Sequence, residues 1–260
     1  EAGELASKFL KAPHDLEYEK TFMPFCLLSK KRYVGMLYEE DPEKCYRKSM
    51  GIVLKRRDNA PIVKDVYGGI IDILMKDQNV SKAIKFTKDM LNDIVDEKFP
   101  LDKLIITKSL RAFYKNPLQI AHKVLADRMG KRDPGTKPGP GDRVPFVYIQ
   151  TKGNVKLQGD KIEHPDYIIA NKLKPDFTHY ITNQIMKPVQ QVFALVLEDI
   201  PEYKKVSQLK RKINGFKRMY KDDLEKFNRY EQKYRNGEVK GLIFDESLSK
   251  CTNIKNKSIK

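Results

Sequence analysis

The N-terminal part of the chain alternates between short apolar runs and polar breaks. Residues 2–11 place Leu5, Phe9 and Leu10 on one helical face, which predicts a helix that ends before Pro13. Apolar runs at 22–28 and 34–38 then predict two neighbouring strands.

A turn between these strands is expected at Ser29-Lys30, where the chain becomes polar. Alternation along the second strand would put Lys31, Tyr33 and Gly35 on one face. A polar loop follows around Asp41-Pro42, before a basic segment at 55–57.

Between residues 61 and 98 the apolar positions recur every three or four residues, which predicts two helices that form part of the core. Gly68 and Gly69 would each weaken the first helix by roughly 1 kcal/mol relative to alanine. Ser81 is a suitable N-cap for the second helix. Its apolar stripe consists of Ala83, Phe86, Met90 and Ile94.

Strands and helices mix in the next hundred residues. Short strands are predicted at 104–106 and 146–149, on either side of a helix from Asn116 to Met129. The proline and glycine density of 131–145 predicts a loop. Asp176 would cap a long helix that Pro188 kinks or interrupts.

The last sixty residues differ in composition. Residues 201–260 hold 17 Lys+Arg and 8 Asp+Glu, a net charge of +9 out of +16 for the whole chain. Apolar residues still recur at helical spacing, so a charged helix with a frayed polar end is predicted there.

Composition narrows the class of protein. The 260 residues are 40% hydrophobic, enough for a folded core, and the net charge of +16 favours nucleic acid or another polyanion as partner. We find no long basic amphipathic helix with a clean apolar face, which argues against a membrane surface as that partner. Three widely separated cysteines argue against a disulfide framework and against a four-ligand zinc site.

The basic tetrad Lys30-Lys31-Arg32-Tyr33 is the strongest candidate for function. A cation two residues from an aromatic ring, with glycine nearby, suits an extended polyanion because it combines charge, a flat apolar body and close backbone approach. On spacing alone, these residues are better explained as a hairpin tip that is basic because it is solvated.

A longer ordered set of motifs resembles family B DNA polymerases, and the delta-type eukaryotic and large-DNA-virus branch is the most similar. The set begins with residues 16–20 (LEYEK) and 27–35 (LLSKKRYVG) and ends with Lys187-Pro188. In between lie 55–58 (KRRD), 104–110 (LIITKSL), 121–122 (AH), 124–129 (VLADRM), 141–147 (GDRVPFV) and 180–185 (YITNQI).

The resemblance implies an α+β fold in which the last β-hairpin elements of a polymerase palm precede a mainly helical thumb with a small β insertion. Residues 1–58 would be the C-terminal part of the palm, 59–200 the thumb and 201–260 a basic helical extension. The two palm motifs whose aspartates hold the magnesium ions in this family do not occur in the sequence. A first residue other than Met also suits a piece of a longer polypeptide.

The resemblance also assigns roles to residues. Lys31 would bond into the minor groove of the primer-template duplex and Tyr33 would position the primer strand, with Arg56 as a second minor-groove residue. The remaining expected DNA-binding residues are Lys30, Arg32, Arg57, Lys108 and Arg143. Arg128, Lys131 and Arg132 would line the thumb, unless they are ordinary solvated charges. Arg57-Asp58 could equally be an internal ion pair.

Glu17 and Glu19 are expected on one strand face, where carboxylates can bind Mg²⁺. From the sequence alone, a solvated face or a salt bridge to Lys20 is the better explanation of these two residues. The resemblance gives Glu19 an accessory position near the metal and no complete catalytic site.

The function implied is that of part of a DNA-directed DNA polymerase that grips the primer-template duplex and is inactive on its own. The implied partners are primer-template DNA, deoxynucleoside triphosphates, the remaining polymerase domains and a sliding clamp, with Mg²⁺ as the cofactor and an intracellular location, the host nucleus or a cytoplasmic virus factory. A free-standing nucleic-acid-binding module and a subunit of a split polymerase remain alternatives.

Overall fold

The computed structural model describes residues 2–39, 41–55, 58–151, 153 and 155–259. It contains two small antiparallel sheets, each of three strands, and many helices, so the predicted α+β class is confirmed. The chain divides into two compact units, Glu1–Ile52 and Val53–Lys260. No helix among the described residues is long and apolar enough to cross a membrane.

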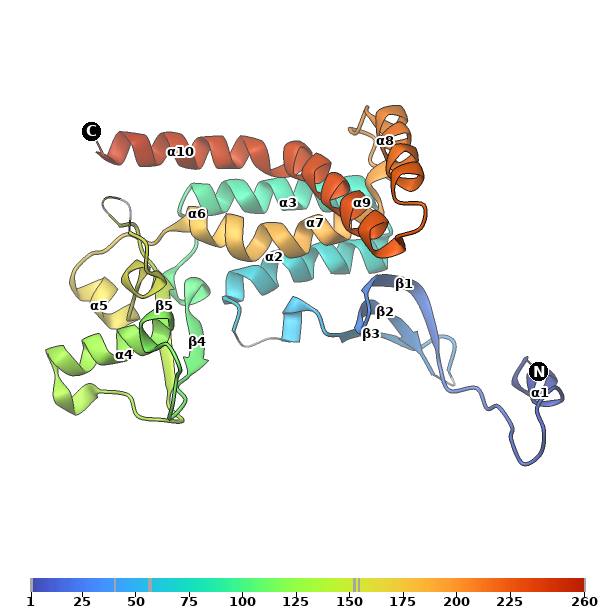
Figure 1. Ribbon diagram of the computed structural model, residues 1–260, viewed down its shortest axis with the longest axis horizontal. Coiled ribbons are helices and arrows are strands. Elements are labelled where there is room, and N and C mark those ends of the chain that lie inside the picture. Colours follow the sequence, from blue (N-terminus) through green and yellow to red (C-terminus); the bar gives the residue numbers. More distant parts are fainter. Residues whose placement is uncertain (1, 40, 56–57, 152, 154, 260) are drawn as a thin grey trace. The chain divides into compact units, whose positions relative to one another are not determined.

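The first unit contains a short helix and the first sheet (Figure 1). Helix α1 (Ala2–Ser7) is shorter than predicted, and Phe9 lies beyond it, 90% exposed. Strands β1 (Thr21–Ser29) and β2 (Arg32–Tyr38) confirm the predicted hairpin, and β3 (Cys45–Met50) adds to β2 to give the order β1-β2-β3.

The turn of this hairpin differs in position from the prediction. It comprises Lys30 and Lys31, and Lys31 has a left-handed backbone with φ of 65°. The prediction that Lys31 lies on the strand was therefore wrong, because the strand begins one residue later, at Arg32.

Long helices form the core of the second unit. Helix α2 (Pro61–Asp72) continues through a π-helical turn, η2 (Ile73–Asp77), and packs against α3 (Val80–Val95). A Cβ on Gly69 would stand 2.3 Å from the Phe86 ring, so this glycine permits the close approach of the two helices. Asn79, and not Ser81, caps α3 by accepting a hydrogen bond of 2.8 Å from the Lys82 amide.

A third long helix lies beside them and consists of α6 (Phe177–His179), the π-helical η7 (Tyr180–Ile185) and α7 (Met186–Leu195). The Asp176 carboxylate accepts from the His179 amide at 3.3 Å, which confirms the predicted cap. The π-helical turn precedes Pro188, where an ordinary α-helix would place the proline ring against the carbonyl four residues earlier.

The second sheet lies at the end of these helices where α6 begins (Figure 1). It consists of β4 (Ile106–Ser109), β5 (Arg143–Tyr148) and β6 (Ile162–Glu163) in that order. The phenol of Tyr180, on the long helix, connects that helix to the second sheet. It donates to the Leu104 carbonyl at 2.7 Å and accepts from the Tyr148 amide at 3.0 Å.

Short helices accompany this sheet. Helix α4 (Ala121–Arg132) is preceded by the 3-10 turn η4 (Pro117–Gln119), so the predicted helix from Asn116 is divided and runs past Met129. The other short elements are η1 (Val53–Lys55), η3 (Leu101–Leu104), η5 (Pro134–Thr136), η6 (Gln158–Lys161), α5 (Pro165–Ala170) and η8 (Leu197–Asp199).

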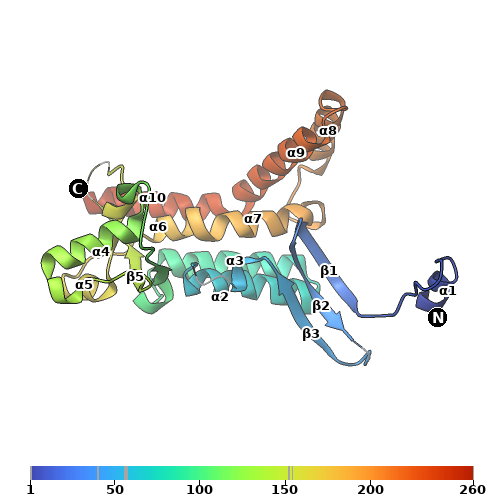
Figure 2. The same ribbon diagram turned by 60° about the horizontal axis from the view of Figure 1, so that its bottom comes forward.

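The C-terminal sixty residues form more than the single charged helix that was predicted. Helices α8 (Val206–Met219) and α9 (Leu224–Val239) form an antiparallel hairpin beside the end of α7, as Figure 2 shows. The chain continues through the π-helical η9 (Lys240–Phe244) into α10 (Asp245–Ile259), which packs along α3. Ile243 and Phe244 are buried, so this segment is part of the core.

Candidate nucleic-acid interface

The basic turn of the first unit is held by backbone contacts. A Cβ on Gly51, which has φ of 63°, would stand 2.4 Å from the Lys31 carbonyl oxygen. The Arg32 Nε donates to the Gly51 carbonyl at 3.2 Å. The turn lies directly against this glycine, and the side chains of Lys30 and Lys31 are exposed.

Tyr33 belongs to a cluster of aromatic rings next to that turn. Its ring centroid lies 5.8 Å from Phe22 and 5.5 Å from Phe25. Gly35 lies against the two phenylalanines, and a Cβ there would stand 2.9 Å from Phe22. Tyr33 is therefore held in place by neighbouring rings, while the lysines of the turn are not.

Glu19 does not occupy the strand position predicted for it. Residues 14–20 precede β1, and the Glu19 side chain is 79% exposed and ion-paired with Lys20. That carboxylate raises the pKa of Lys20 through their hydrogen bond. Among the described residues no group of three or more potential ligands could hold a metal, so no complete magnesium site forms around Glu19 within this part of the chain.

Two of the predicted DNA-binding residues, Arg56 and Arg57, lie outside the described residues. The second unit brings two others together. Lys108 on β4 and Arg143 on β5 are on paired strands, with Ser109 opposite Arg143 in the register. Both border an open cleft of about 670 Å³. Its other lining residues are Asp58, Thr107, Ser109, Arg111, Tyr114, Ile120 and His122.

The cleft is lined mainly by basic and neutral polar groups. Arg143 donates to the Ser109 hydroxyl at 3.3 Å and to the Thr107 carbonyl at 3.2 Å, which orients its guanidinium along β4. Within the part of the chain that the structure describes, Lys108, Arg111 and Arg143 form no ion pair. Their positive charge therefore faces solvent.

Two residues of the cleft, Tyr114 and His122, were not predicted as site residues. The Tyr114 hydroxyl lies 3.1 Å from His122 Nε2 and accepts from the Arg111 amide at 2.8 Å. Burial and, to a smaller extent, the charge of Lys108 lower the pKa of His122. A sequence signal was available for Tyr114, because residues 108–115 combine three cations with two adjacent aromatic residues, Phe113 and Tyr114.

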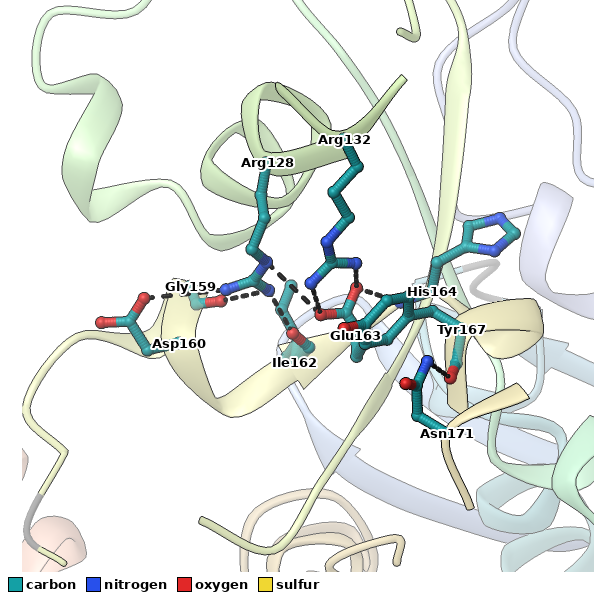
Figure 3. Close-up of polar contacts among 9 residues, drawn as sticks. All are labelled: Arg128, Arg132, Gly159, Asp160, Ile162, Glu163, His164, Tyr167 and Asn171. Carbon is teal, nitrogen blue, oxygen red and sulfur yellow. Dashed lines mark hydrogen bonds and ion pairs between the residues drawn. The ribbon is translucent and has the colours of Figure 1, made fainter. Parts of the chain in front are cut away.

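Two arginines that the sequence suggested for the thumb surface point to an internal carboxylate instead (Figure 3). Arg132 binds Glu163 through two parallel hydrogen bonds of 3.1 and 2.9 Å, and its guanidinium lies 3.6 Å from the Tyr167 ring centroid. Glu163 is only 4% exposed. We call Arg128, Arg132 and Glu163 the arginine clasp.

Arg128 completes the clasp through backbone contacts. It donates to the carbonyls of Gly159 at 3.1 Å and Ile162 at 2.5 Å, while its Nε lies 3.4 Å from a Glu163 oxygen. These contacts attach the end of α4 to η6 and β6. Lys131, between the two arginines in sequence, is exposed.

Comparison with known proteins identifies the family. Residues 2–196 match the sequence pattern of DNA polymerase family B. A DNA polymerase of Pyramimonas orientalis virus is 54% identical over 258 residues, covering 97% of this chain and 21% of the relative. One from Acanthamoeba polyphaga mimivirus is 52% identical over 202 residues, covering 76% of this chain and 12% of the relative.

A DNA polymerase delta catalytic subunit of Candida albicans is 37% identical over 198 residues, covering 76% of this chain and 19% of the relative. The solved family B DNA polymerase of the archaeon Pyrobaculum calidifontis shares the fold, with a TM-score of 0.55 at 23% identity, over 74% of this chain and 24% of the other. The chain thus spans about a fifth or less of the curated relatives above. It belongs to DNA polymerase family B.

Proposed function

We propose that the chain is the palm-and-thumb portion of a DNA-directed DNA polymerase and that it grips the primer-template duplex. The observation that carries this proposal is the cleft, whose unpaired cations lie on β4, on the loop that follows β4 and on β5. Residues 1–58 would belong to the palm, 59–200 to the thumb and 201–260 to a basic extension.

The cleft suits the phosphate backbone. Lys108, Arg111 and Arg143 supply exposed charge, and Arg143 is held along the strand by hydrogen bonds to neutral groups. Each phosphate that such a cation neutralises releases counterions, which gives affinity without sequence preference. A polymerase must hold any sequence that it has copied, so this kind of grip fits the task.

The basic turn has a different role in the proposal. Exposed Lys31 contacts base edges in the minor groove, while Tyr33, fixed among aromatic rings, positions the primer strand. Minor-groove acceptors occur at every base pair, so a cation there senses pair geometry and not base identity. Lys30 and Arg32 support the same contact, and Arg56 and Arg57 stay predicted DNA-binding residues.

Nucleotidyl transfer belongs to the complete polymerase, together with deoxynucleoside triphosphates, the other domains and a sliding clamp. Mg²⁺ would supply two-metal chemistry there. Because Glu19 is paired with Lys20, this portion contributes duplex binding and at most an accessory carboxylate.

A titration of labelled primer-template with the chain tests the proposal. Affinity should fall steeply as salt rises from about 50 to 200 mM, because phosphate neutralisation dominates. Addition of the N-terminal part of the polymerase should restore synthesis. Duplex binding without any restored synthesis would favour a free-standing binding module, and a flat salt dependence would contradict the proposed grip.

A further inference from the structure

Helix α8 carries an unusual excess of positive charge. Its fourteen residues include Lys210, Arg211, Lys212, Lys217 and Arg218 and no acidic residue. All five cations are exposed. Within the described residues they form no ion pair.

Four of the five cations lie on one face of α8, and Lys212 lies apart from them. Lys210 and Lys217 are seven residues apart, as are Arg211 and Arg218, so each pair lies two turns apart on the same side. The spacing along the helix is about 10 Å. Asn214, between the two pairs, is also exposed.

The opposite face of α8 is covered by its neighbour α9. Leu209 is fully buried, and the Phe216 ring lies 6.1 Å from the rings of Tyr230 and Tyr234. Beyond the helix end, Tyr220 stacks on Tyr230 at 4.9 Å. Because the apolar face is occupied within the hairpin, α8 does not have the free apolar face with which an amphipathic helix enters a membrane.

Charged residues on α9, unlike those on α8, form ion pairs. Its Arg235 binds Glu231 at 2.9 Å and Glu198 at 3.1 Å, and its Glu238 lies 3.7 Å from Lys205. The Gln190 side chain on α7 donates to the Asn236 carbonyl at 3.0 Å. These polar contacts anchor α9 to the rest of the unit, so the cations of α8 are not needed to hold the hairpin.

We propose that the face of α8 formed by Lys210, Arg211, Lys217 and Arg218 is a second binding surface for the phosphate backbone of duplex DNA. It is separate from the cleft. Helix α9 contacts α7 through Asn236 and Gln190, whereas the cleft is lined by residues of β4 and β5. These strands lie at the opposite end of the long helix formed by α6 and α7 (Figure 1). The inference rests on the proposed function, because duplex DNA is the polyanion that this chain would hold.

The surface lies outside the part shared by the whole family, because the family match ends at residue 196. The relative from Pyramimonas orientalis virus aligns over 258 residues and therefore covers the hairpin. The adjacent cations Lys210 and Arg211 lie about 10 Å along the helix from Lys217 and Arg218, so the two sets can neutralise separate phosphates.

The main test replaces all four residues: Lys210→Gln, Arg211→Gln, Lys217→Gln and Arg218→Gln. A matched control removes the same charge from cations that are ion-paired: Lys82→Gln, Lys98→Gln, Lys226→Gln and Lys240→Gln. Both variants, the wild type and Lys108→Gln are titrated with a labelled duplex at several salt concentrations.

The α8 variant should bind the duplex about tenfold or more weakly at physiological salt, and its salt dependence should be less steep by about 2 to 4 in the log–log slope. The control variant should change much less. Wild-type affinity and slope in the α8 variant, with weaker binding by Lys108→Gln, would overturn this inference and leave the proposed function standing. No duplex binding by the wild type would overturn both.

A second measurement works on the unaltered chain and does not depend on a folded variant. Lysine acetylation followed by mass spectrometry should show Lys210 and Lys217 protected when duplex is bound. Lys212, which is about 200° around the helix from Lys210, should stay reactive. Equal reactivity of all three with and without duplex would overturn the inference, as would protection by anionic vesicles but not by DNA.

Discussion

The second unit holds basic side chains in two contrasting settings around one small sheet. In the arginine clasp, Arg128 and Arg132 share Glu163, whose side chain is 5% exposed. In the cleft, Lys108 and Arg143 face solvent and border one acidic residue, Asp58. The comparison shows that the position of the acids, more than the number of cations, decides which charges are available to a polyanion.

The two settings also differ in what a charge change would do. Removal of a buried carboxylate that pairs with two guanidiniums is costly, because it leaves their positive charges uncompensated in a partly buried site. Neutralising an exposed cation changes the free energy of unfolding of the protein only slightly. A charge change in the clasp should therefore lower the free energy of unfolding, whereas a charge change in the cleft should weaken DNA binding.

The largest effect is expected from Glu163→Gln in the clasp. It leaves Arg132 without its counter-ion and Arg128 with only the half-exposed Asp160, so the free energy of unfolding should fall by about 3 kcal/mol. Urea denaturation followed by circular dichroism would measure it. Asp160→Asn is the control, because Asp160 is half exposed and lies 3.8 Å from Arg128, and it should cost less than about 1 kcal/mol. Equal losses in both variants would contradict a structural role for the clasp.

The next largest effect is expected in the cleft. Lys108→Gln with Arg143→Gln should weaken duplex binding about tenfold and reduce the slope of affinity against salt by about 2, one unit per lost phosphate contact. Anisotropy titrations at several salt concentrations would measure both. The unfolding free energy should change by less than about 1 kcal/mol.

The control for the cleft removes the same charge from the neighbouring α4 region. Lys123 and Lys137 both pair with Asp127, so Lys123→Gln with Lys137→Gln should alter binding much less. If the two double variants lose affinity equally, the cleft grips no phosphate and the charge acts only at long range.

The sequence predicted the elements whose apolar pattern is strong. The β1–β2 hairpin, the α2–α3 pair and the cap at Asp176 all follow from hydrophobic spacing or a local hydrogen bond. Strand β3 was not predicted, since it lies at the sheet edge and most of its side chains are exposed, which removes the alternation. The α8–α9 hairpin was missed because residues 220–223 turn without glycine or proline.

Lys108 and Arg143 were predicted from the resemblance to family B DNA polymerases and not from their spacing, because the pairing of β4 with β5 brings them together although they are far apart in the sequence. The partner of Arg132 likewise lies far away, 31 residues later, in a two-residue strand. Sequence spacing carries no signal for such a tertiary ion pair, so clasp arginines and cleft cations looked alike.

A smaller effect is expected at the basic turn. Lys31→Ala should weaken primer-template binding about fivefold, the value of one hydrogen bond near 1 kcal/mol. Lysine and alanine are equally unsuited to a φ of 65°, so the change removes the charge without new backbone strain. Lys44→Ala, whose lysine pairs with Asp41 at 3.0 Å, is the matched control. Equal losses would mean that the turn is only a solvated hairpin tip.

The smallest effect concerns the protonation of His122 in the cleft. Burial, helped by the charge of Lys108, holds the pKa of His122 below its usual value near 6.5. The unfolded chain therefore takes up a proton at His122 before the folded chain does, and the contribution of this residue to stability falls as pH drops below about 6.5. Lys108→Gln should raise the pKa of His122 and reduce that loss, which NMR titration of the imidazole protons would detect.

Duplex binding should act on the same imidazole in the same direction. Phosphates placed beside His122 would favour its charged form, so binding through the cleft should raise its pKa and take up protons. Lys82→Gln, which removes a lysine on α3 paired with Asp77, serves as the control for the effect of Lys108. If duplex binds with full affinity and leaves the His122 titration unchanged, then the DNA does not enter the cleft, and the contrast between clasp and cleft concerns folding alone.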